Sequence, residues 1–153
     1  MSEFSRLALV VSDAPLAREA AETEFTDVTD WVPLDEAEAV VVLGGDGFML
    51  QTLHGMLDSG RIIPAYGLNL GTVGFLMNRN RNPETLVKRI NKAKPHHIAP
   101  LRMCAVTQDG EKHTFCAINE VSLLRETRQT AKLEVMVDDK VRIPELVCDG
   151  VLL

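Results

Sequence analysis

The apolar positions in the first two thirds of the chain follow two alternating patterns. Leu7–Val11 and Ala39–Leu43 are continuous apolar runs, which are typical of parallel strands covered on both faces. A helical pattern follows each run: the segment from Pro15 to about Glu24 is rich in Ala and Glu, and residues 48–57 carry apolar side chains at helical spacing. The pattern therefore predicts repeated strand–helix units.

Two further elements continue this alternation. Ile62–Leu70 can supply a third strand, provided that Pro64 lies near its start or on an edge. Asn82–Ala93 has the marks of a helix start, with Asn as a cap, Pro at the first helical position and Glu in the first turn. Together these elements predict an α/β layer with a mainly parallel sheet.

The pattern changes to short strands and turns from Leu101 onward. Asp109-Gly110 and Asp138-Asp139 each separate two strand-like runs, which predicts two hairpins, and no helical pattern appears in this half. We therefore predict an α/β domain over residues 1–98 and the first part of an all-β domain over residues 99–153. Because the chain stops at Leu153 inside an apolar run, we expect this second domain to be interrupted.

Composition narrows the class of protein. The 153 residues are 46% hydrophobic and carry 22 acidic against 16 basic side chains, without a dense basic cluster. This balance argues against binding to nucleic acid or to an anionic membrane surface. No apolar run approaches the roughly 20 residues that cross a bilayer. Three cysteines without C-x-x-C spacing and four histidines without a ligand pair fit a reduced cytoplasm better than a disulfide framework or a zinc site.

The sequence Gly44-Gly45-Asp46-Gly47 directly follows the second apolar run. Asp-Gly between apolar runs is a hairpin signal, but the residues that follow have a helical period, so the unit is a strand, a glycine turn and a helix. Such a junction presents free backbone N–H groups to a phosphate. The Asp46 carboxylate could cap the helix, hold a metal ion that bridges phosphates, or accept a proton during phosphoryl transfer.

A second glycine-rich stretch, Asn69-Leu70-Gly71-Thr72-Val73-Gly74-Phe75, follows the third strand. Glycine turns at the carboxyl ends of neighbouring parallel strands face one crevice, where ligands bind in open α/β folds. The alternative is a plain glycine-rich connection.

These two motifs, followed by Asn119-Glu120 and Asp149-Gly150, resemble the NAD kinase family over essentially the whole chain. The resemblance implies a Rossmann-like N-terminal α/β domain, a C-terminal β-sandwich-like domain and a site between them. It also implies transfer of a phosphoryl group from ATP to the 2′-hydroxyl of the adenosine ribose of NAD, which gives NADP.

The resemblance assigns roles to individual residues. Asp46 would accept the proton of the ribose hydroxyl, and Phe75 would form an apolar wall against the dinucleotide. By themselves, Asn119-Glu120 would be interpreted as a polar strand edge, and Asp149-Gly150 as a turn. The other positions that the resemblance places in the binding site are Gly44, Gly45, Gly47, Asn119, Glu120 and Asp149.

The family also implies partners. They are NAD and either ATP or polyphosphate, with Mg²⁺ or another divalent metal accompanying ATP. We expect no nucleic acid and no membrane partner, a homodimer or homotetramer, and a cytoplasmic location.

The chain departs from the family pattern in three places. Phe48 stands where a small hydroxyl residue is usual, and Val147 stands where a basic residue often precedes the last aspartate. The Thr/Ser/Gly-rich loop that the family carries after the position of Asp149 is absent, so we expect residues 1–153 alone to be inactive. The alternatives are a lipid kinase of the diacylglycerol or sphingosine type, a phosphofructokinase-like enzyme and a non-catalytic nucleotide-binding module.

Overall fold

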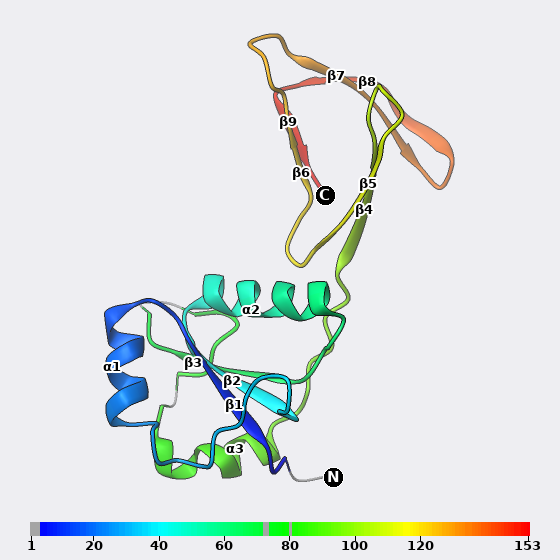
Figure 1. The fold of residues 1–153 in the computed structure, drawn as a ribbon. Helices are drawn as coiled ribbons and strands as arrows, with labels where there is room; N and C mark the ends of the chain where they lie inside the picture. The colour runs from blue at the N-terminus through cyan, green and yellow to red at the C-terminus, as the bar shows by residue number, and fades with distance from the viewer. Residues whose placement is uncertain (1–3, 72–73, 80) are drawn as a thin grey trace. The chain divides into compact units, whose positions relative to one another are not determined.

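A computed structural model describes residues 4–71, 74–79 and 81–153 of the chain (Figure 1). The chain divides into two compact units, Met1–His97 and Ile98–Leu153. The fold is mixed α/β, with a parallel three-stranded sheet in the first unit and further β-strands in the second. This confirms the predicted change from strand–helix alternation to strands alone.

The first unit is built on a parallel sheet in the order β1-β2-β3. The central strand β2 pairs with both neighbours, and Gly44 at its carboxyl end lies opposite Asn69 of β3. Each predicted strand is present, and β3 begins directly after Pro64, as predicted. The elements in chain order are β1 (Leu7–Val11), α1 (Pro15–Thr23), β2 (Ala39–Gly44), α2 (Asp46–Ser59), β3 (Ala65–Asn69), the 3-10 turn η1 (Pro83–Thr85) and α3 (Leu86–Lys92).

Apolar side chains cover both faces of this sheet. Val41 and Leu43 of β2 belong to one cluster, which includes buried residues of α1 and α3. Val40 and Val42 belong to the other, which includes buried residues of α2. All six residues of β2 are buried, which explains why its sequence is a continuous apolar run. Figure 1 shows α2 and α3 on opposite sides of the sheet.

The helix predicted at Asn82–Ala93 forms in two pieces. Its first turn is the 3-10 turn η1, and α3 follows directly. The Asn82 side chain accepts a hydrogen bond from the backbone N–H of Glu84 at 2.9 Å, so the predicted cap is present. A 3-10 geometry is common in the first turn of a helix.

The second unit consists of antiparallel strand pairs. The hairpin of β4 (Leu101–Val106) and β5 (Lys112–Ala117) and the hairpin of β7 (Ala131–Val137) and β8 (Lys140–Cys148) occur where the sequence predicted them. The third pair joins β6 (Ser122–Leu124) to β9 (Gly150–Leu152). No helix lies between residues 101 and 153, all of which the structure describes, in agreement with the prediction.

The two units differ in burial. Among the described residues, the buried apolar ones lie between Leu7 and Ile90, and no residue from 98 to 153 is buried. Two-stranded pairs without a covered face are only marginally stable in water. The first unit therefore holds the core of this chain.

Glu38, which precedes β2, holds the start of β1. One of its carboxylate oxygens accepts hydrogen bonds from the backbone N–H of Ser5 at 2.8 Å and of Arg6 at 3.1 Å. These bonds, that from Ser5 foremost, lower the pKa of Glu38 from its ordinary value of 4.5. The charged form of this carboxylate is therefore favoured in the folded state.

Hydrogen exchange should separate the two units. In the 153-residue chain, the amides of β2 should exchange roughly 100-fold or more slowly than those of β4–β9, because β2 is buried within a packed sheet and the others are not. Exchange followed by NMR measures this difference. Equal protection in the two units would contradict it.

Glu38→Gln should lower the melting temperature of the chain at neutral pH. Because the folded-state pKa of Glu38 lies below its unfolded value, its contribution is complete above the unfolded pKa and is lost as the pH falls through the folded pKa. The difference in melting temperature between wild type and variant should therefore shrink as the pH is lowered below 4.5. Melts by circular dichroism measure it. Glu36→Gln, which removes an exposed charge nearby, is the control, and a difference that does not change with pH would argue against this role.

Candidate functional site

The two glycine-rich stretches lie at the carboxyl edge of the parallel sheet. The β2 strand ends at Gly44 and α2 begins at Asp46, so this turn joins a strand to a helix. This confirms the predicted unit of strand, glycine turn and helix and excludes the hairpin alternative. The β3 strand ends at Asn69, opposite Gly44, which places the second stretch beside the first, as predicted.

The glycines of the first stretch serve different purposes. A Cβ on Gly44 would lie 3.1 Å from Ser12 and from the Phe48 ring, so Gly44 packs tightly against these side chains at the end of β2. A Cβ on Gly45 or Gly47 would meet nothing within 4 Å. Packing therefore does not require these two glycines, and the space beside them is open at the amino end of α2.

The Asp46 carboxylate binds the second glycine-rich stretch. Its Oδ2 accepts a hydrogen bond from the backbone N–H of Phe75 at 2.7 Å, and its Oδ1 accepts one from the N–H of Leu76 at 3.0 Å. The N-cap of α2 is Gly45, and no side chain caps that helix end. The interpretation of Asp46 as a helix cap is therefore wrong. We refer to this pair of hydrogen bonds as the Asp46 clamp.

Asn69 organises the second stretch from within. This residue is buried, and its Oδ1 accepts a hydrogen bond from the backbone N–H of Gly71 at 2.9 Å. A Cβ on Gly74 would lie 3.2 Å from the Asn69 side chain, so a glycine fits closely there. Thr72 and Val73 of this motif lie outside the described residues.

The Asp46 carboxylate can bind the hydroxyl group of a ligand. A carboxylate has about four lone-pair positions, so each Asp46 oxygen that accepts one amide hydrogen can accept another donor. The side chain is only partly buried, and the neighbouring Phe75 is 92% exposed. A hydroxyl-bearing ligand can therefore reach both the carboxylate and the phenylalanine ring.

Ser12 is a further polar residue at this edge, which sequence reasoning did not single out. It follows β1, and its backbone N–H donates to the Leu43 carbonyl at 2.9 Å. Its Oγ is buried and has no hydrogen-bond partner among the residues that the structure describes. No motif in the sequence marks this position.

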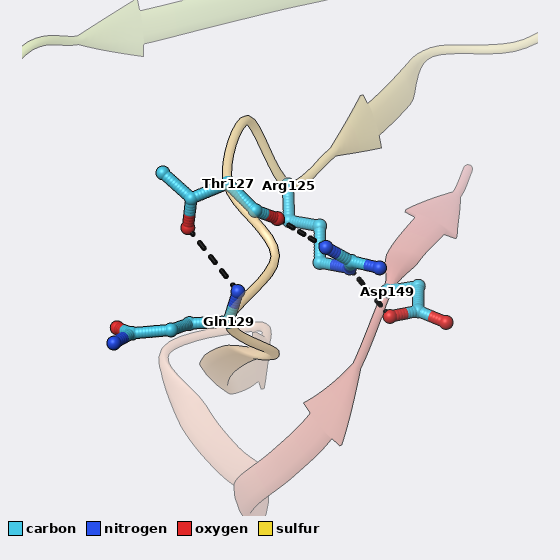
Figure 2. Close-up of polar contacts among 4 residues, drawn as sticks. All are labelled: Arg125, Thr127, Gln129 and Asp149. Carbon is cyan, nitrogen blue, oxygen red and sulfur yellow. Dashed lines mark hydrogen bonds and ion pairs between the residues drawn. The ribbon is translucent and has the colours of Figure 1, made fainter.

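The predicted residues of the second unit do not gather at one point. Asn119 and Glu120 lie exposed between β5 and β6. Asp149 precedes β9, at the opposite end of the β6–β9 pair, where its Oδ1 accepts a hydrogen bond from Nε of Arg125 at 2.6 Å (Figure 2). Asp149-Gly150 joins two strands and is not a hairpin turn. Arg125 was missed because 24 residues separate it from Asp149.

The described residues offer no separate metal site. Among residues 4–71, 74–79 and 81–153, no three His, Cys, Asp or Glu side chains are grouped so that they could hold a metal ion. All three cysteines are free.

Comparison with known proteins finds relatives of this chain. The chain is 57% identical over 147 residues to an NAD kinase of Rhizorhabdus wittichii. The aligned residues cover 96% of this chain and 56% of that protein. It is 53% identical over 150 residues to an NAD kinase of Zymomonas mobilis (98% of this chain, 57% of that protein) and 50% identical over 149 residues to one of Caulobacter vibrioides (97% and 56%). Over nearly its whole length, the chain therefore matches the N-terminal portion of proteins named NAD kinase.

The match to these NAD kinases covers only part of their length. The chain spans about 56% of the length of these relatives and corresponds to their N-terminal portion. The relatives give no support to a lipid kinase or a non-catalytic module. No protein-family model matches the chain. In the described part of this NAD kinase homologue, no helix has both the length and the apolar character to span a membrane.

The Asp46 clamp can be tested by its effect on stability. Asp46→Asn replaces one acceptor oxygen by an NH₂ group, so one of the two amides loses its partner. The free energy of unfolding should fall by about 1 kcal/mol, and the amides of Phe75 and Leu76 should exchange faster. Denaturant titration and NMR exchange measure these effects.

Asp58→Asn is the matched control for the Asp46 clamp. It removes the same charge from an exposed position near the carboxyl end of α2, where a negative charge is unfavourable. It should leave stability unchanged or slightly raised. Equal stability of Asp46→Asn and wild type, with unchanged exchange at Phe75 and Leu76, would show that the clamp does not hold the segment.

Proposed function

We propose that this chain forms the phosphoryl-acceptor part of an NAD kinase, which transfers the γ-phosphoryl group of ATP to the 2′-hydroxyl of the adenosine ribose of NAD. The products are NADP and ADP. The observation that carries the proposal is the Asp46 clamp, which fixes a partly exposed carboxylate beside the open glycine turn. The identity to relatives named NAD kinase supports the choice of NAD as acceptor.

In this proposal Asp46 accepts the proton of the attacking ribose hydroxyl. Phosphoryl transfer depends mainly on positioning and on stabilisation of charge, and a positioned base contributes about 10²–10⁴-fold. The clamp supports such a role because it fixes the carboxylate through main-chain groups, so the base does not have to be ordered when the substrate binds. Gly44, Gly45 and Gly47 provide the backbone of the same site.

A divalent ion would enter this site with ATP. Mg²⁺ is commonly held by one or two carboxylates together with substrate phosphates. Among the described residues no three His, Cys, Asp or Glu side chains are grouped to hold the ion by themselves, so the substrate phosphates would supply most of its ligands and Asp46 would remain the base. The ion would neutralise charge on the phosphates, and Asp46 would orient the hydroxyl.

Four further residues are proposed to bind the dinucleotide. The exposed ring of Phe75 would provide an apolar surface, and the Asn119, Glu120 and Asp149 side chains would supply polar contacts. Their exposure supports this role, because each polar group is accessible to a ligand.

Other properties of the proposed enzyme follow from its family. We propose a Rossmann-like N-terminal domain and a β-sandwich-like second domain, with boundaries at residues 1–98 and 99–153. We also propose that the protein forms a homodimer or homotetramer in the cytoplasm, without a nucleic-acid or membrane partner. Its donor would be ATP, with polyphosphate as the alternative.

Asp46→Asn in the full-length enzyme, by which we mean the gene product that contains this chain, tests the proposal. The kcat for NADP formation with NAD, ATP and Mg²⁺ should fall roughly 10²-fold or more, because the variant cannot accept the proton. The KM for ATP should change little. Residues 1–153 alone should form no NADP.

The control Asp58→Asn should retain wild-type kcat. A thermal melt beside each assay separates loss of chemistry from loss of structure. Wild-type turnover by folded Asp46→Asn enzyme would show that Asp46 is not the base. Absence of NADP formation by the wild-type enzyme would overturn the proposed function itself.

A further inference from the structure

We propose that Arg125 is a positioning residue that fixes the Asp149 carboxylate for binding the dinucleotide. This inference rests on the proposed function and adds to it a residue that no motif assigns. Leu124 and Gly150 are the last pair of the β6–β9 ladder at this end. Arg125 follows Leu124 and Asp149 precedes Gly150, so these two residues face each other just beyond that pair. Figure 2 shows their contact.

Arg125 binds Asp149 through both its main chain and its side chain. Its backbone N–H donates to the Asp149 carbonyl at 2.9 Å, and its Nε donates to the Asp149 Oδ1 at 2.6 Å. A hydrogen bond between two charged groups is shorter and stronger than one between neutral groups. The backbone bond sets where the two residues meet, and the side-chain bond then selects one orientation of the carboxylate.

The guanidinium group is itself held in place. A terminal nitrogen of Arg125 also donates to the backbone carbonyl of Thr127, whose Oγ1 accepts a hydrogen bond from the Gln129 N–H at 3.3 Å (Figure 2). An ordinary surface ion pair is weak partly because both side chains must be ordered to form it. Here the loop after β6 orders the arginine, whose side chain is only 31% exposed.

Gly150 makes this approach of the strands possible. A Cβ at this position would lie 2.6 Å from the carbonyl oxygen of Leu123 and 3.3 Å from a methyl carbon of Leu124. Only glycine allows β9 to pair this closely with β6 without a shift of the backbone. The glycine of the Asp-Gly motif therefore helps to bring Asp149 to Arg125.

The pair leaves part of the carboxylate available to a ligand. The Asp149 side chain is 70% exposed, and within residues 98–153 its Oδ2 accepts no hydrogen bond. A carboxylate oxygen of this kind accepts hydrogen bonds from donors such as ribose hydroxyls. The carboxylate lies at an open surface hollow, whose lining residues are Leu124, Arg125, Glu126, Thr127, Arg128 and Asp149.

The test compares four versions of the full-length enzyme: wild type, Arg125→Met, Asp149→Asn and the double variant. Arg125→Met should raise the KM for NAD about tenfold, because a carboxylate that is no longer fixed must be ordered on binding. The kcat and the KM for ATP should stay within about threefold of wild type. In the Asp149→Asn background, Arg125→Met should add less than about twofold, because the two residues act as one unit.

Two further variants separate positioning from a structural role or a charge effect. Arg125→Lys keeps the positive charge, so its KM for NAD should lie between those of wild type and Arg125→Met. Lys132→Met removes a positive charge from another cross-strand ion pair of the same unit, in which Nζ lies 3.3 Å from Glu145, and should leave both KM values unchanged. Melting curves show which variants fold, and if Arg125→Met does not, Arg125→Lys replaces it in the cycle.

The possible results have distinct meanings. An unchanged KM for NAD in a folded Arg125 variant overturns the inference, as does an equal increase with and without the Asp149 carboxylate. A wild-type KM in Asp149→Asn also overturns it, while NADP formation by that variant leaves the proposed function intact. Absence of NADP formation by the wild-type enzyme overturns both.

Discussion

The candidate site depends on the hydrogen bonds from the backbone of Phe75 and Leu76 to the Asp46 carboxylate. They connect the turn after β2 to the segment after β3, two parts of the chain that the parallel sheet brings to one edge. A negative charge beside open glycine backbone would repel a phosphate group, so the carboxylate needs a compensating environment. Two backbone amides supply it, and they also fix where the carboxylate lies.

This connection requires a rigid support, which β2 provides. The strand is buried along its whole length, with α2 packed on one face and α1 and α3 on the other. Close packing on both faces leaves little freedom for the turn that begins at Gly44. The second unit has no comparable core, since none of its residues is buried. Its strand pairs hold their local geometry through hydrogen bonds between backbones and through contacts such as that of Arg125 with Asp149.

The carboxylates of Asp46 and Asp149 illustrate two ways of fixing an acidic side chain near the surface. Asp46 accepts hydrogen bonds from main-chain amides, which cannot move without the segment that carries them. Asp149 is held by an arginine whose own position depends on a loop carbonyl. At Asp149, the glycine that follows allows the close approach of β9 to β6 that makes the contact possible. Each arrangement leaves lone pairs of the carboxylate for a ligand.

The sequence by itself determined the elements and their type, because apolar periodicity and turn residues act over a few neighbouring positions. It predicted the strands, the helices, the hairpins at Gly110 and at Asp138-Asp139, and the meeting of two glycine turns at one edge. It did not decide what Asp46 binds, since the capping interpretation required only local geometry and the actual partners lie 29 and 30 residues away. Arg125 and Asp149 are likewise 24 residues apart and meet only because β6 pairs with β9. Contacts of this range depend on how the strands pair, and therefore only the tertiary structure decided them.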